Sequence, residues 1–199
     1  MDILKELGLT ESESEQLKAI AVKHSANDRA TKLIEELGEL TVELARLGRK
    51  DKRASLESLA EEMADVFNVG YELLSLLPKG LKKFDLITSQ MSLSLSSDTS
   101  TPDLELSNIK WPDGHCAEAF CYIKWCVFTL NSKGAAQYDD DVFDTSFCFS
   151  GLCRSYVGLF SHYNGLREAF IASKEYKRNR YANYLDFQEK LKKGDTHEG

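Results

Sequence analysis

The chain has 199 residues, of which 42 % are hydrophobic, and its formal net charge is −7. This length suits one domain, or one domain that carries an insertion, with a buried core. The negative charge and the lack of a basic tract argue against a nucleic-acid partner, since such proteins bind largely by neutralising phosphates. The sequence contains no run of 18 apolar residues, so no membrane span is predicted. Residues 1–12 also lack the basic-then-apolar order of a signal peptide, so we expect a cytoplasmic protein.

Helical periodicity predicts three helices in the N-terminal part of the chain. The first, over residues 10–24, begins with Thr10 and Glu13 at the spacing of a capping box. The second, over residues 29–47, follows a Ser-Ala-Asn-Asp segment and carries leucines at alternating steps of four and three. The third begins after a plausible N-cap at Ser55 and ends near Leu77, before a proline.

The rest of the chain divides into a polar segment and three further blocks. Residues 88–108 are rich in Ser and Thr and poor in core residues, which predicts a linker or loop. Residues 114–131 and 142–164 are predicted to be helical, although the aromatic residues of the second block also fit a partly extended segment. A last helix is predicted over 164–184, followed by a polar tail over 189–199.

The cysteines and histidines do not form a metal-binding or nucleophilic pattern. The five cysteines include no CxxC pair, and their spacing by five residues spreads them around a helix. We interpret them as free thiols, and the four histidines as structural or surface residues.

The second and third helices each carry acidic residues three positions apart. The first pair is Glu36 and Glu39, with Glu35 beside them, and the second pair is Glu62 and Asp65. Residues at i and i+3 share a helix face, so each pair can direct two carboxylates to one place. Four carboxylates around one point need a cation to offset their repulsion, and oxygen ligands favour Mg²⁺ or Mn²⁺.

The alternative is a solvated acidic face, which is common on amphipathic helices. Projected at about 100° per residue, Asp65 lies far from the apolar stripe of its helix, so it points to solvent unless that helix packs on more than one side. Val66 and Val69 allow such packing. Glu43 also lies at helical spacing from Glu39, but we interpret it as a surface residue.

The order EExxE, 22 intervening residues and ExxD resembles the signature of the all-alpha NTP pyrophosphatases, the MazG-like superfamily. The resemblance covers residues 29–77 and includes the apolar context of the acids. It implies a single all-α domain over 1–199, with a four-helix core formed by 10–77 and 165–184. A mostly helical insertion would occupy 88–164. The apolar surface left by such a core, and the habit of the family, imply a homodimer or a dimer of dimers.

The resemblance also implies an activity and its residues. Such an enzyme hydrolyses a nucleoside or deoxynucleoside triphosphate between the alpha and beta phosphates, as nucleotide-pool house-cleaning. Mg²⁺, or Mn²⁺ in its place, would be held by Glu36, Glu39, Glu62 and Asp65. Glu35, or a ligand carboxylate such as Glu36, would orient or deprotonate the attacking water.

Substrate contacts are expected from the last helix and from the helix that carries Asp65. In the final helix the family shows a frame like K..YN..R, and Arg180 occupies its last position. Lys177 stands where the Asn is expected, and Lys174 lies next to the position of the Lys. These three residues are candidates for phosphate contacts, or else part of a solvated basic helix. Asn68, one turn after Asp65, is a candidate substrate contact or an ordinary surface residue.

Several alternatives stay open at this point. Trp111 and Trp125 could stack on a base, or belong to the core. The same fold could act on phosphoribosyl-ATP. The altered residues of the last helix also allow a catalytically silent helical module that binds a partner protein or nucleotide without a metal. The sequence leaves the base preference open between dUTP, dCTP and other nucleotides.

Overall fold

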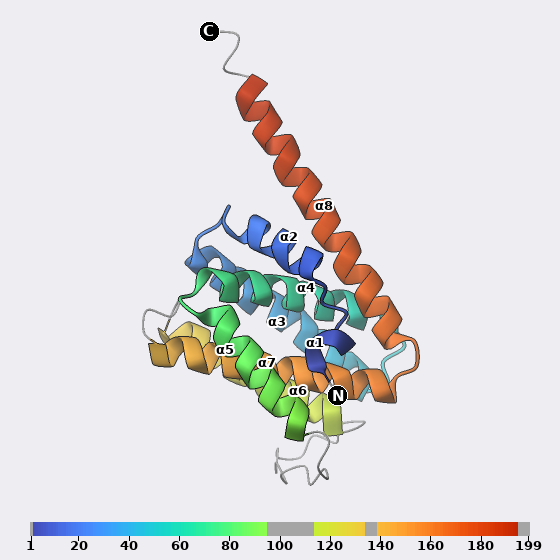
Figure 1. Ribbon diagram of the computed structural model, residues 1–199. Coiled ribbons are helices and arrows are strands. Elements are labelled where there is room, and N and C mark those ends of the chain that lie inside the picture. Colours follow the sequence, from blue (N-terminus) through green and yellow to red (C-terminus); the bar gives the residue numbers. More distant parts are fainter. Residues whose placement is uncertain (1, 95–113, 134–138, 195–199) are drawn as a thin grey trace.

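The structure is a computed structural model that describes residues 2–94, 114–133 and 139–194 (Figure 1). These residues form helices and no strand, which confirms the predicted all-α class. In the described residues the helices are α1 Ile3–Glu6, α2 Glu11–Ala21, α3 Ala26–Gly48, α4 Leu56–Leu76, α5 Gly80–Ser94, α6 Gly114–Lys133, α7 Asp139–His162 and α8 Leu166–Gly194. None of these helices is long and apolar enough to cross a membrane.

Local capping signals begin the helices α2, α3 and α4. Thr10 and Glu13 form a reciprocal capping box at the start of α2, as predicted. Ser25 and Asp28 form a second box, so α3 begins three residues earlier than expected. Ser55 accepts a backbone N–H at the start of α4. These side chains satisfy N–H groups that have no acceptor within their own helix.

The helix α4 is the centre of the fold. It contacts α2, α3, α5, α7 and α8 (Figure 1). Its buried residues lie on several faces and include Met63, Phe67 and Leu74. This helix therefore packs on more than one side, which is the condition under which Asp65 could turn inward.

The linker predicted over residues 88–108 overlaps a helix in the structure. Its residues 88–94 belong to α5, which contacts α4 and α7. The helix forms because Phe84, Ile87 and Thr88 recur at helical spacing and are all buried. The rest of that linker, residues 95–108, lies outside the described residues, and so does Trp111, which follows it.

The two blocks that follow are helical, and so is most of the predicted tail. The helices α6 and α7 confirm the predicted helices, and the partly extended alternative for the second block is wrong. The helix α8 continues through residues 189–194, so the prediction of a tail is wrong for these residues. Residues 195–199 lie outside the described part. Figure 1 shows the C-terminal part of α8 projecting beyond the other helices.

The helices α5 to α7 share one core with the rest of the molecule. The ring of Phe67 in α4 lies 6.2 Å from that of Phe149 in α7 and 5.9 Å from that of Phe170 in α8, between centroids. Tyr156 of α7 also belongs to this core. The predicted insertion is therefore packed against the predicted core helices.

The cysteines are free thiols, as predicted. Four of them are buried and Cys121 is half-buried. Of the histidines, His24 has a structural partner, since its Nε2 lies 2.9 Å from the hydroxyl of Tyr181.

Two glycines in neighbouring helices offer a matched test of this packing. A Cβ at Gly70 of α4 would overlap the ring of Phe149, whereas a Cβ at Gly38 of α3 would meet nothing. We expect Gly70→Ala to lower the free energy of unfolding by about 1–3 kcal/mol through overpacking. Gly38→Ala should raise it by about 0.5–1 kcal/mol, because alanine favours the helix. Urea unfolding measures both, and equal effects would contradict the close α4–α7 contact.

Candidate functional site

Three of the predicted acidic residues converge where α3 meets α4. Glu36 of α3 and Glu62 and Asp65 of α4 each offer a carboxylate oxygen, and these oxygens all lie within 4.8 Å of one another. They lie together because α3 packs against α4 and because Glu62 and Asp65 share a face of α4. We call these three residues the carboxylate cluster. Its donor set could hold a metal ion.

The environment of the cluster disfavours three free negative charges. Burial raises the pKa of Glu62 to about 7, partly opposed by Lys177. Burial also raises the pKa of Glu36, against the hydrogen bond from Lys32, and the pKa of Asp65, against Lys177. Such carboxylates favour either protonation or a nearby cation.

Two lysines offset part of this charge. The ammonium of Lys32 lies 2.7 Å from Glu36, and that of Lys177 pairs with Asp65. One buried oxygen of Glu36 and one of Glu62 have no hydrogen-bond partner among the described residues. The cluster therefore keeps acceptor capacity that its own lysines do not use.

The remaining acids of the predicted site lie outside this cluster. Glu39 is exposed one turn along α3, although its charge contributes to the raised pKa of Glu62. Glu35 is also exposed and lies 3.0 Å from Lys32. Glu43, interpreted from the sequence as a surface residue, is instead buried and pairs with Arg46.

A cavity of about 510 Å³ adjoins the cluster. This volume is typical of a small-molecule site. Its acidic lining residues come from α3 and α4, its basic ones from α3 and α8, and its other lining residues are polar, aromatic or apolar. The lining consists of Glu36, Asp65, Glu72, Arg29, Lys32, Lys177, Arg178, Arg180, Asn68, Tyr181, Tyr184, Ile20 and Val69.

Three of the four predicted substrate contacts line this cavity. Lys177 and the exposed Arg180 reach it from α8. Asn68 is buried instead of solvated, and its amide nitrogen donates to the carbonyl of Lys174 over 3.2 Å. The Oδ1 atom of Asn68 is buried and has no hydrogen-bond partner in the described part of the chain.

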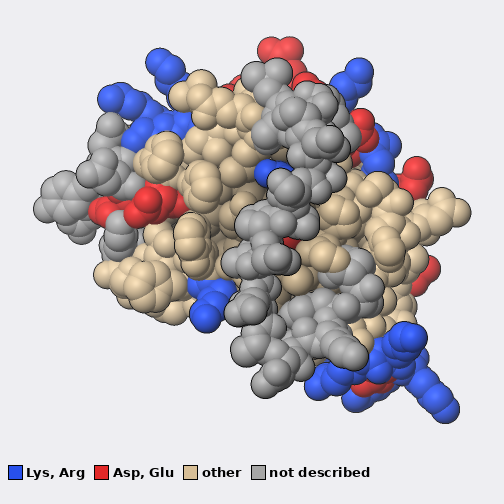
Figure 2. Space-filling model, turned by 90° about the horizontal axis from the view of Figure 1, so that it is seen from below, with Lys and Arg blue, Asp and Glu red and all other residues tan. Residues whose placement is uncertain are grey.

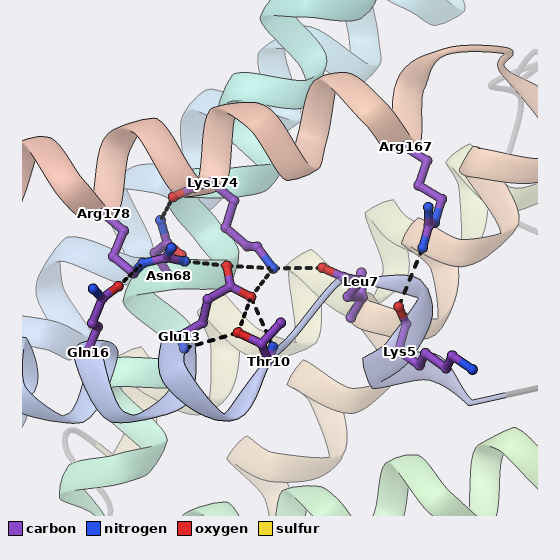
Figure 3. A network of polar contacts seen from close by, with 9 residues as sticks. All are labelled: Lys5, Leu7, Thr10, Glu13, Gln16, Asn68, Arg167, Lys174 and Arg178. Carbon is purple, nitrogen blue, oxygen red and sulfur yellow. Dashed lines mark hydrogen bonds and ion pairs between the residues drawn. The ribbon is translucent and has the colours of Figure 1, made fainter.

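The prediction that Lys174 contacts phosphates does not fit the structure. Its side chain is fully buried, and its ammonium donates to the carbonyl of Leu7 over 2.7 Å and lies 3.4 Å from Glu13 (Figure 3). It also lies over the rings of Phe67 and Phe170, at 5.1 and 5.7 Å from their centroids. Lys174 faces α1 and α2 because the inner face of α8 packs there, and its side chain does not line the cavity.

Arg178 extends this network and was not predicted from the sequence. Its guanidinium pairs with Glu13, and its Nε donates to Gln16 over 2.7 Å (Figure 3). Burial alone would raise the pKa of Glu13, but Lys174, Thr10 and Arg178 together hold it below its usual value. Lys174 and Arg178 are four residues apart, so they share one helix face. That spacing is the signal that could have placed them together.

Another unpredicted pair lines the same cavity. The Nη1 atom of Arg29 in α3 is 2.9 Å from an Oε atom of Glu72 in α4. Burial raises the pKa of Glu72 to about 7, although Arg29 opposes the rise.

This raised pKa predicts a pH dependence of stability. Between pH 4.5 and 7 the folded protein holds a proton on Glu72 that the unfolded chain releases, so the free energy of unfolding falls as pH rises through this window. Between pH 5 and pH 8 the free energy of unfolding should therefore fall by about 2 kcal/mol less in Glu72→Gln than in the wild type. Urea unfolding at both pH values tests this, with Glu57→Gln on the exposed face of α4 as the control. An unchanged slope in Glu72→Gln would contradict the assignment.

Comparison with known proteins adds no relative. The chain matches no protein-family model, and no curated protein or solved structure matches it significantly. Membership of the MazG-like superfamily therefore stays a prediction from the acidic pattern.

Proposed function

We propose that the protein is a divalent-metal-dependent pyrophosphohydrolase that cleaves nucleoside triphosphates to the monophosphate and pyrophosphate. The observation that carries this proposal is the carboxylate cluster, of which Glu36 and Asp65 line a cavity that also presents basic side chains. Acidic groups suit a metal ion, and cations suit the phosphates.

The donor set fits Mg²⁺, with Mn²⁺ as the alternative. Glu36, Glu62 and Asp65 offer carboxylate oxygens only, and two of these oxygens lack partners among the described residues. When bound, such an ion neutralises phosphate oxygens and lowers the pKa of a coordinated water. Glu39 as a fourth ligand stays a prediction.

The basic residues at the edge of the cluster would hold the phosphates. Lys32 and Lys177 already lie beside the carboxylates, and Arg180 lines the same cavity. Their charges would stabilise the leaving pyrophosphate. Glu35, or Glu36 itself, would orient the attacking water and accept its proton.

A product analysis tests the proposal. The wild-type protein is incubated with each dNTP and NTP in Mg²⁺, in Mn²⁺ and in EDTA, and the products are separated by ion-exchange chromatography. We expect a monophosphate and pyrophosphate in equal amounts, and none in EDTA. A diphosphate with phosphate, or no product from any nucleotide, would refute the proposal. Binding without hydrolysis would instead favour the silent binding module.

The homodimer also belongs to this proposal. In the helices α5 to α7, Leu86, Trp125, Phe128 and Phe143 are exposed. Figure 2 views the molecule from the side of these helices and shows uncharged residues of the described part between the charged groups. A second copy could cover such apolar side chains. Light scattering should give the mass of two chains or a multiple of it, and a monomer at micromolar concentration would contradict this.

A further inference from the structure

The cavity joins the carboxylate cluster to a second level of charged groups. Arg29 precedes Glu36 by seven residues in α3, and Glu72 follows Asp65 by seven residues in α4. Seven residues make two helical turns, a rise of about 10 Å. Because the two helices run in opposite directions, these steps bring Arg29 against Glu72. The cavity therefore has groups for a metal and phosphates at one level, and a second polar pair about 10 Å farther along.

This second level is shielded from solvent and has unused hydrogen-bonding groups. The side chain of Glu72 is 5 % exposed and that of Arg29 is 12 % exposed. The Nε atom of Arg29 and the Oδ1 atom of Asn68, one turn from Glu72, have no hydrogen-bond partner among the described residues. Buried polar atoms are costly when unpaired, so these atoms in the cavity wall indicate a polar ligand.

Aromatic side chains of α8 also line this cavity. Tyr181 and Tyr184 both line it, and their rings are stacked with centroids 6.2 Å apart. The contact of the Tyr181 hydroxyl with His24 helps to fix the first ring. Flat aromatic faces of this kind bind nucleotide bases by stacking.

We propose that this end of the cavity binds the base, and that Glu72 selects bases with an exocyclic amino group, as in cytosine and adenine. The inference rests on the proposed function and adds its substrate class. A carboxylate accepts a hydrogen bond from an amino group, and the Nε–H of Arg29 can donate to the adjoining ring nitrogen. The 4-oxo group of uracil or thymine is itself an acceptor, so it would face the carboxylate without a hydrogen bond and be repelled by it.

Binding of non-hydrolysable nucleotides tests this selection. The α,β-methylene analogues of dCTP, dATP, dUTP and TTP are titrated by calorimetry with Mg²⁺ at pH 8, where Glu72 is mainly ionised. The wild-type protein should bind the two amino bases about tenfold or more tightly than the two oxo bases. Glu72→Gln, whose amide both donates and accepts, should narrow this ratio to about threefold or less. The matched control Glu57→Gln, on the exposed face of the same helix, should keep the wild-type ratio.

The outcomes separate this inference from the function on which it rests. Equal affinities for the four bases, or an unchanged ratio in Glu72→Gln, would overturn the selection by Glu72 even if all four nucleotides are hydrolysed. Failure of every analogue to bind, together with no pyrophosphate release, would refute the proposed function as well. Glu72→Gln removes a buried charge and should fold, which its urea midpoint verifies.

Discussion

Glu62→Gln should lower metal-dependent pyrophosphate release about a hundredfold or more. Glu62 is the member of the carboxylate cluster without an ion pair among the described residues, and one of its buried oxygens has no hydrogen-bond partner. The amide has similar shape but loses the negative charge that a cation needs. The rate is measured at increasing Mg²⁺, so that a weakened metal site appears as a higher half-saturating concentration.

The neighbouring Glu61 provides a matched control for this substitution. Its side chain is exposed, and only its backbone carbonyl accepts a hydrogen bond, from the ammonium of Lys177, among the described residues. Glu61→Gln should therefore keep the rate and the metal dependence of the wild type. Full activity in Glu62→Gln, or an equal loss in both variants, would show that the cluster is not the metal site.

Lys174→Ala should lower the free energy of unfolding by about 3–5 kcal/mol. The substitution leaves a void in the core and removes the donor to the carbonyl of Leu7 and a cation beside the buried Glu13. Burial lowers the pKa of Lys174, and Glu13 opposes the fall, so the two groups depend on one another. Chemical unfolding in urea measures the loss.

Arg180→Ala separates this structural role from substrate binding. Arg180 lies on the same helix, is exposed and lines the cavity. Its removal should change the stability by less than about 0.5 kcal/mol but weaken nucleotide binding. If Lys174→Ala were as stable as the wild type and lost only nucleotide affinity, Lys174 would return to the phosphate-binding role that the sequence predicted.

Local sequence signals predicted much of the helical framework. The Thr10 box and the Ser55 cap act through neighbouring residues, so they can be recognised without knowing the fold. Asp65 was harder, since its own helix places it away from the apolar stripe. It turns inward because α8 covers that side of α4 and brings Lys177 to it.

Other features depend on contacts that the sequence pattern does not reveal. Lys174 and Lys177 are both basic residues of one helix, but only packing decides that one is buried against Glu13 and the other pairs with Asp65. The pair of Arg29 and Glu72 was missed because its members are 43 positions apart. Their equal offset of seven residues from Glu36 and Asp65 was a visible signal.

The central claim is that the carboxylate cluster binds a divalent cation, and a crystal soaked in Mn²⁺ tests it most directly. Anomalous diffraction locates Mn²⁺ independently of any assay. We predict a peak bounded by Glu36, Glu62 and Asp65 that is lost in Glu62→Gln. The absence of a peak there at saturating Mn²⁺, with the three side chains still together, would contradict the metal site and the function built on it.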